Sequence, residues 1–166
     1  MKLRRITFFC CCIILLANFS GCNINQTEYL RIHIRANSDE FCDQAVKYEI
    51  RDEVVKYLTP KVNNCNSLNE AITAIEESES AVNELIDGFL YQKGFSYTSK
   101  ISVRKEEFPT RVYDGVTLPA GEYYAVIVEL GKADGANWWC VVYPPLCFSG
   151  ENSVRYRSIF SDIFKG

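Results

Sequence analysis

The fold of this chain depends most on the stretch Asn137-Trp138-Trp139-Cys140-Val141-Val142-Tyr143-Pro144-Pro145-Leu146-Cys147-Phe148. It holds both tryptophans of the protein, and its aromatic and β-branched residues predict a strand over Trp138–Tyr143. Pro144 and Pro145 end that strand, because proline has no N–H for a sheet and a fixed φ. Side chains alternate along a strand, so Trp138 and Trp139 point to opposite faces. Both faces are apolar, which means that the strand is covered on both sides or keeps one face for a partner.

A second strand is expected far upstream, over Tyr29–Ala36. Its residues alternate without a slip, with Arg31, His33 and Arg35 on one face and apolar residues on the other. The polar turn Asn37-Ser38-Asp39 follows, and its short side chains are expected to cap a helix. That helix carries apolar residues at every fourth position and is predicted to end at about residue 58, because Thr59-Pro60 follows.

The pattern from Leu68 to Leu90 predicts one further helix, capped by Asn66 or Ser67 and packed back on the first. The rest is β-rich, with extended segments expected over residues 95–105, 108–113 and 122–130. Residues 131–136 are expected to join the last of these to the Trp138 strand in a hairpin. The order β-α-α-β-β-β-β predicts an α+β fold: a single domain with a mostly antiparallel sheet and a two-helix hairpin packed on it.

The N-terminus has the features of an export signal. A basic start is followed by an apolar run over residues 6–17 that is short for a membrane span, so residues 1–21 are predicted to be a signal peptide. Its end, Phe19-Ser20-Gly21-Cys22, resembles a bacterial lipobox and makes Cys22 a candidate for lipidation. Ordinary cleavage nearby and an uncleaved anchor are the alternatives.

The charge of the chain argues against nucleic acid as a partner. Residues 1–21 contain three basic residues and no acid, so removing them changes the net charge from −3 to −6. Binding to nucleic acid depends on clustered cations, which such a chain lacks. After residue 148 the chain is a polar tail, in which Ile159-Phe160 and Ile163-Phe164 suggest a short docked helix.

Four cysteines remain outside the signal region: Cys42, Cys65, Cys140 and Cys147. Disulfides form outside the cytoplasm, and the bend after Pro144-Pro145 makes Cys140–Cys147 the candidate pair. Two buried thiols are the alternative. Cys42 and Cys65 stand at opposite ends of the first predicted helix, about 24 Å apart at 1.5 Å per residue, too far for a disulfide.

A catalytic or metal site is not evident in the sequence. The single histidine, His33, excludes a site with several histidine ligands. His33 could pair with the thiol of Cys140 or Cys147, but a hydrogen-bonded strand residue near the helical pair is the favoured interpretation. Asp39 and Asp43 are interpreted as capping groups, with a calcium site at that turn as a minor alternative. We therefore expect no enzyme, no metal and no cofactor.

Three ordered blocks of the sequence are similar to one known family. The first contains Leu30-Arg31-Ile32-His33, Ala36-Asn37-Ser38-Asp39, Asp43-Gln44, Lys47 and Arg51-Asp52. The second contains Phe108-Pro109-Thr110, Tyr113, Leu118-Pro119-Ala120-Gly121-Glu122-Tyr123 and Ala125. The third contains Asn137-Trp138-Trp139-Cys140 and Pro144-Pro145-Leu146-Cys147-Phe148. Over residues 29–148 the chain thus resembles the stage II sporulation protein R family. It departs from the family at Arg35, where an apolar residue is usual, and at residues 132–134, where the family loop is richer in glycine.

The resemblance implies an intercellular signal of endospore formation. Such a protein is exported from the forespore into the space between the forespore and the mother cell. There it activates a membrane-embedded aspartic protease of the mother cell. The protease then processes pro-sigma-E. A lipid on Cys22 would tether the signal to the outer face of the forespore membrane. The competing interpretation is an exported lipoprotein with a cell-wall or peptide-binding role.

The candidate partner-binding surface combines the Trp138–Phe148 segment with the Asn37–Asp43 turn. Its members share polar-turn or aromatic character beyond what capping and packing require. They are His33, Asn37, Ser38, Asp39, Asp43, Trp138, Trp139, Pro144, Pro145 and Phe148.

Overall fold

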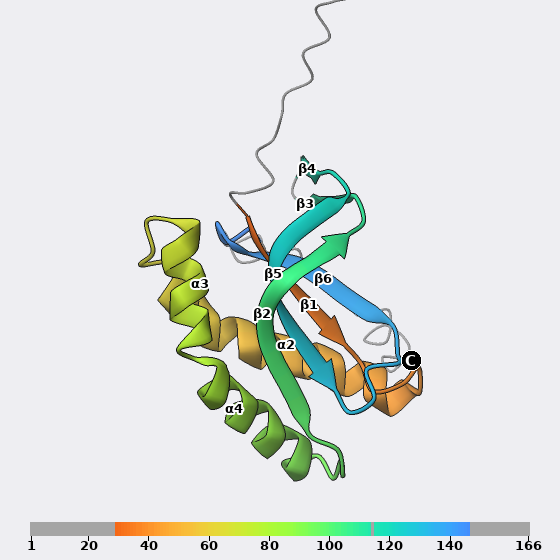
Figure 1. The fold of residues 1–166 in the computed structure, drawn as a ribbon. Helices are drawn as coiled ribbons and strands as arrows, with labels where there is room; N and C mark the ends of the chain where they lie inside the picture. The colour runs from red at the N-terminus through yellow and green to blue at the C-terminus, as the bar shows by residue number, and fades with distance from the viewer. Residues whose placement is uncertain (1–28, 114, 147–166) are drawn as a thin grey trace, which may run out of the picture.

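The structure is a computed structural model that describes residues 29–113 and 115–146. Its elements, in chain order, are β1 (Leu30–Arg35), α2 (Phe41–Val62), α3 (Leu68–Glu76), α4 (Glu79–Gln92), β2 (Ser99–Phe108), β3 (Arg111–Tyr113), β4 (Val116–Leu118), β5 (Gly121–Leu130) and β6 (Asn137–Tyr143). They form a single α+β domain, which confirms the predicted class (Figure 1). The predicted signal peptide, Cys22, Cys147, Phe148 and the tail lie outside the described residues.

The main sheet has the order β2-β5-β1-β6. β1 is parallel to β5, and the other two pairs are antiparallel. The predicted hairpin of the last two strands is wrong, because β1 lies between them: Ile32 is paired with Val126 of β5 and Cys140 of β6. The connecting loop instead crosses the end of β1, where Gly135 N–H donates to Ala36 O at 3.0 Å. β3 and β4 form a separate two-stranded hairpin.

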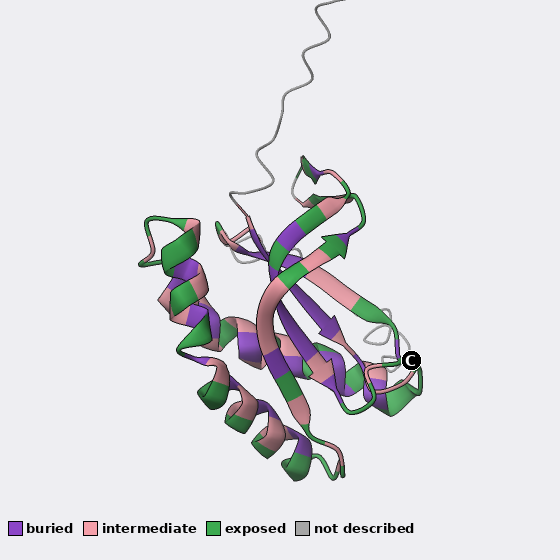
Figure 2. Cartoon of the chain, in the orientation of Figure 1, coloured by how far each residue is buried: buried purple, intermediate pink, exposed green. Residues whose placement is uncertain are grey.

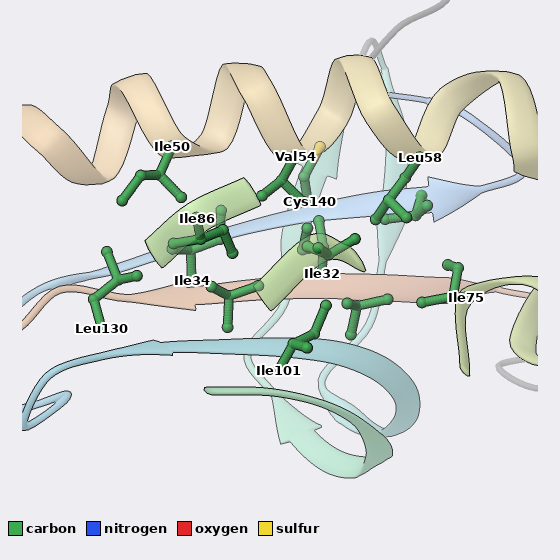
Figure 3. Close-up of a cluster of buried hydrophobic side chains, with 14 of the residues drawn as sticks. Ile32, Ile34, Ile50, Val54, Leu58, Ile75, Ile86, Ile101, Leu130 and Cys140 are labelled. Carbon is green, nitrogen blue, oxygen red and sulfur yellow. The ribbon is translucent and has the colours of Figure 1, made fainter. Parts of the chain in front are cut away.

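The three helices lie on one face of the main sheet and enclose the larger core (Figures 1 and 3). The apolar residues of β1 point into this core, as their alternation predicts, and Ile32 and Ile34 are fully buried. They meet apolar side chains from all three helices, among them Ile50, Val54, Leu58, Ile75 and Ile86. The helices show buried residues toward the sheet and exposed residues outward (Figure 2). Each large side chain buried here contributes about 1.5–3 kcal/mol to stability.

α2 continues through Pro60, so the prediction that Thr59-Pro60 ends the helix is wrong. Proline removes one hydrogen bond, but it does so in the last turn, where Asn63 N–H still donates to Thr59 O at 3.0 Å. Val62 in that turn is fully buried in the core. Burying a valine contributes about 1.5–3 kcal/mol, similar to the cost of one proline inside a helix.

The segment predicted as one helix from Leu68 is two helices, α3 and α4, which Glu77 and Ser78 separate. Ser78 is buried, its N–H donates to Ile75 O at 2.9 Å, and its hydroxyl donates to Ala74 O at 2.7 Å. Serine competes with regular helix geometry through such bonds to the backbone. Neither glycine nor proline stands at the break, so the sequence does not predict it. The break lets both Ile75 and Val82 reach the core.

Ser67 caps α3, as predicted, because its hydroxyl accepts a hydrogen bond from Glu70 N–H at 3.2 Å. The Glu70 carboxylate accepts in turn from Asn66 N–H at 2.8 Å. Ser67→Ala removes the cap and is expected to lower the free energy of unfolding by about 1 kcal/mol in urea denaturation. Ser80→Ala, at an exposed position of α4, is the matched control and should change stability little. Equal losses in the two variants would contradict the assigned cap.

Candidate functional site

The face of the main sheet opposite the helices carries charged side chains of β1, β2 and β5. We call it the polar face and define it by Arg31, His33, Arg35, Arg104, Glu106, Glu129 and Trp139. The three β1 members point away from the helices because they alternate with the core residues Leu30, Ile32 and Ile34. The predicted division of this strand into an apolar and a polar face is thereby confirmed.

An ion-pair network crosses the polar face from β2 to β1. His33 Nδ1 lies 2.9 Å from Glu106 Oε2, and Arg35 donates to the other oxygen of the same carboxylate. Arg35 also lies 3.0 Å from Glu129 Oε1, which Arg104 approaches at 3.3 Å. Each carboxylate thus has two basic partners, and the network fixes the orientation of His33.

Arg31 is the most unusual residue of the polar face, because it is fully buried and has no ion-pair partner among the described residues. Its guanidinium carbon lies 4.1 Å from the ring centre of Phe108 and 4.8 Å from that of Tyr123. One nitrogen donates to Tyr113 Oη at 2.8 Å, but Nε and the other terminal nitrogen have no hydrogen-bond partner among the described residues. Leaving such donors unsatisfied in a buried cation costs several kcal/mol, which the aromatic contacts offset in part.

Trp139 joins the polar face to the β3–β4 hairpin. Its ring stacks on His33, with the ring centres 5.2 Å apart, and the guanidinium carbon of Arg111 lies 4.5 Å from the Trp139 ring centre. His33 Nε2 is buried and has no hydrogen-bond partner among the described residues. The structure therefore places His33 and Arg111 against the ring of Trp139.

The position of His33 corrects one part of its prediction. His33 is hydrogen-bonded, but it lies on the face away from the helices rather than near them. Cys140 is opposite Ile32 and belongs to the helix-side core, so its sulfur and the His33 ring occupy opposite faces of the sheet. A thiol–imidazole pair of Cys140 with His33 is excluded by this arrangement. Cys147, the other candidate thiol and the predicted disulfide partner, lies outside the described residues.

Asn37, Ser38, Asp39 and Asp43 form a network at the end of β1, but they do not cap α2 as predicted. The N-cap residue is Glu40, whose side chain makes no capping bond. Asp43 accepts instead from Asn37 Nδ2 at 2.7 Å and from Ser38 Oγ at 2.6 Å. Asp39 Oδ1 accepts from Ala136 N–H at 2.6 Å. These side chains serve a long-range contact, since they hold the loop after β5 against the start of α2.

Asp43 is the centre of this network and is 5% exposed. Burial raises the pKa of the Asp43 carboxyl, but hydrogen bonds from Ser38, Tyr97 and Asn37 lower it by more. The resulting pKa is below the ordinary value for an aspartate. The Tyr97 hydroxyl donates to Asp43 Oδ1 at 2.7 Å, and its own pKa is raised by burial and by that bond. The ionised form of Asp43 is therefore the one that the fold requires.

The lowered pKa of Asp43 predicts acid sensitivity. The pKa of this carboxyl is lower in the folded protein than in the unfolded chain, where it is about 3.9. Its contribution to stability is therefore complete at pH values above the unfolded pKa and is lost as the pH falls through the folded pKa. Asp43→Asn should flatten the fall in the free energy of unfolding below about pH 4, measured by urea denaturation at several pH values. Glu84→Gln, at an exposed position of α4, is the control and should follow the wild-type curve. Identical curves for wild type and Asp43→Asn would contradict the assigned role.

A buried lysine extends the same junction. Lys47 is 1% exposed, and its Nζ donates to Gln44 Oε1 at 2.7 Å and to Ala136 O at 2.8 Å. Burial lowers the pKa of this amine, Asp39 raises it, and Arg51 lowers it. The network that begins at Asp43 thus reaches the start of β6.

The remaining predicted site residues do not form one surface with this network. Trp138 packs against the helix-side core, with Arg51 5.6 Å from its ring centre, whereas Trp139 lies on the polar face, and both are half-buried. Pro144 and Pro145 follow the end of β6, as predicted, while the Asn37 turn is beside its start. The structure therefore unites His33 with Trp139 and gathers the four turn residues, but it separates the prolines from both.

The sequence interpretation did not single out Arg31, Glu106 or Arg111. The sequence carried no signal for the first, because Arg31 alternates with His33 and Arg35 in the same strand and its burial depends on distant strands. Within residues 29–113 and 115–146, no group of three or more His, Cys, Asp or Glu side chains could hold a metal ion. The helices of the same residues include none that is long and apolar enough to cross a membrane. Cys42 and Cys65 are free thiols.

Comparison with known proteins assigns the family. Residues 26–153 match the family described as stage II sporulation protein R. The chain is 40% identical over 121 residues to "Stage II sporulation protein R" of Bacillus subtilis (strain 168), a match that covers 73% of this chain and 54% of the relative. The chain thus spans about half the length of that curated relative. No solved structure matches it. The chain belongs to the stage II sporulation protein R family of sporulation proteins.

Proposed function

We propose that this chain is an exported signal of endospore formation that activates a membrane-embedded aspartic protease, which then processes pro-sigma-E. The observation that carries the proposal is the family match, because residues 26–153 include the whole described domain. In this scheme the chain is the activator and the protease cleaves the peptide bond. The site of action is the space between the forespore and mother-cell membranes.

Activation requires the chain to bind the active arrangement of the protease more tightly than the inactive one. The polar face suits such a role, because the ion pairs of Glu106 and Glu129 hold side chains of β1, β2 and β5 in a fixed arrangement. A surface that is already ordered loses little conformational entropy on binding. We include in the proposal export by residues 1–21, a lipid anchor on Cys22 and a Cys140–Cys147 disulfide that stabilises the segment after β6.

The test is reconstitution in a non-sporulating bacterium that carries the membrane protease and pro-sigma-E. The full chain is made in one strain, and a version without residues 1–21 is made in another at the same level. We expect shortened sigma-E, seen by immunoblot, only with the exported chain. Equal cleavage by the retained version would contradict an external activator. Absence of cleavage with the chain exported and folded would contradict activation by this chain alone and favour a cell-wall role.

A further inference from the structure

The polar face and the adjoining strand β3 carry more positive charge than the carboxylates of the polar face neutralise. Glu106 and Glu129 pair with His33, Arg35 and Arg104. Arg31 and Arg111 make no ion pair with any described residue. The protein as a whole has a net charge of −3, so this excess of positive charge is local.

The two unneutralised arginines are at different depths of the same site. Arg111 is half-buried and lies over Trp139, which stacks on His33. Arg31 is fully buried two residues before His33 on β1, and two of its nitrogens have no hydrogen-bond partner among the described residues. Arg111 is therefore the group that a ligand meets first, and Arg31, which donates to Tyr113 on the same strand β3, is a fixed positive charge beneath the surface.

We propose that the polar face binds an acidic segment of a partner protein, with a carboxylate on Arg111 and the charge of Arg31 in support. The proposal rests on the function proposed above, in which the partner is the protease. Arginine suits this task, since its planar group binds a carboxylate through two hydrogen bonds while it stacks on an aromatic ring. Such an ion pair speeds association and selects the partner by charge.

Charge also favours a protein segment over a membrane surface. The acidic chain as a whole is repelled by anionic lipid, and its sequence has no polybasic segment of the kind that binds such lipid. A single patch with positive excess on an acidic protein is complementary to a short acidic segment. The aromatic surface of Trp139 provides apolar contact beside the charges.

The first test reverses one charge in the reconstituted cells that carry the protease and pro-sigma-E. Arg111→Glu should reduce the rate of cleavage roughly tenfold or more at equal exported amounts, and Arg111→Lys, which keeps the charge but loses the planar group, should give an intermediate rate. Lys56→Glu makes the same change of charge at an exposed position of α2 and should match wild type. Wild-type cleavage by Arg111→Glu, or an equal loss in Lys56→Glu, would overturn the proposal.

A second test does not depend on proteolysis, so it separates this proposal from the proposed function. A photo-crosslinking amino acid replaces Asn137, an exposed residue on the polar face, in the full chain made by spore-forming cells, and Tyr91 on α4 is the control position. Mass spectrometry of the adduct should identify a protein segment rich in Asp and Glu at position 137 only. An adduct with lipid or with a basic segment, or no more adduct than at position 91, would overturn the proposal whether or not cleavage is seen.

Discussion

Gly135→Ala is expected to lower the free energy of unfolding by about 2–4 kcal/mol. A Cβ at this position would lie 2.2 Å from Ser38 O and 2.4 Å from Ser38 C. Both are backbone atoms, so no change of rotamer relieves the contact, and the loop must move away from the turn. That movement breaks the bond from Gly135 N–H to Ala36 O and weakens those of Ala136 with Asp39 and Lys47.

Gly88→Ala is the matched control for this prediction. Gly88 lies inside α4, and a Cβ there would have no atom within 4 Å. Alanine is favoured over glycine in a helix by roughly 0.5–1 kcal/mol, so this variant should be more stable than wild type. Urea denaturation of the full chain measures both. Equal stability of Gly135→Ala and wild type would show that the loop is not seated on Ser38 as the structure has it.

Arg31→Met is expected to reduce activation of the protease at least tenfold while it changes stability by no more than about 1 kcal/mol. Methionine fills a similar volume among Phe108, Tyr113 and Tyr123, and it relieves the cost of burying an unpaired charge. The lost bond to Tyr113 and the lost cation–π contacts act in the opposite direction. These losses offset most of that relief, so the change in stability should be small, and the proposal assigns the charge of Arg31 mainly to binding.

Arg35→Met is the informative contrast to Arg31→Met. Arg35 neutralises Glu106 and Glu129, and its removal leaves two partly buried carboxylates with fewer partners. This variant should lose about 2 kcal/mol of stability in urea denaturation. If Arg31→Met is the less stable of the two variants, the contacts of Arg31 with the surrounding aromatic rings stabilise the fold. The functional interpretation of this residue would then be wrong.

The elements that local patterns specify could be predicted from the sequence. The alternation in β1 gave both of its faces, because side chains in a strand change face at every residue. Ser67 could be predicted as a cap because its hydroxyl stands three residues before Glu70. The class α+β follows from the same patterns, and the structure confirms it.

Features that depend on distant pairing could not be predicted in the same way. The insertion of β1 between β5 and β6 joins residues about a hundred positions apart, and the loop pattern at Gly131–Ala136 suits a hairpin equally well. The surroundings of Arg31 come from β2, β3 and β5, so its burial without a carboxylate is visible only after folding. For the same reason the carboxylate of Asp39 was interpreted as a helix cap rather than the acceptor for Ala136.

The most direct test of the central claim is to ask which protein cuts pro-sigma-E in the reconstituted cells. The fraction of shortened sigma-E is measured in cells that export equal amounts of this chain. One strain also makes the intact protease, and the other makes a protease variant whose catalytic aspartates are replaced by alanine. An activator predicts cleavage only when the exported chain and the intact protease are both present. Cleavage that persists with the inactive protease, or that proceeds at the same rate without the exported chain, would contradict the account.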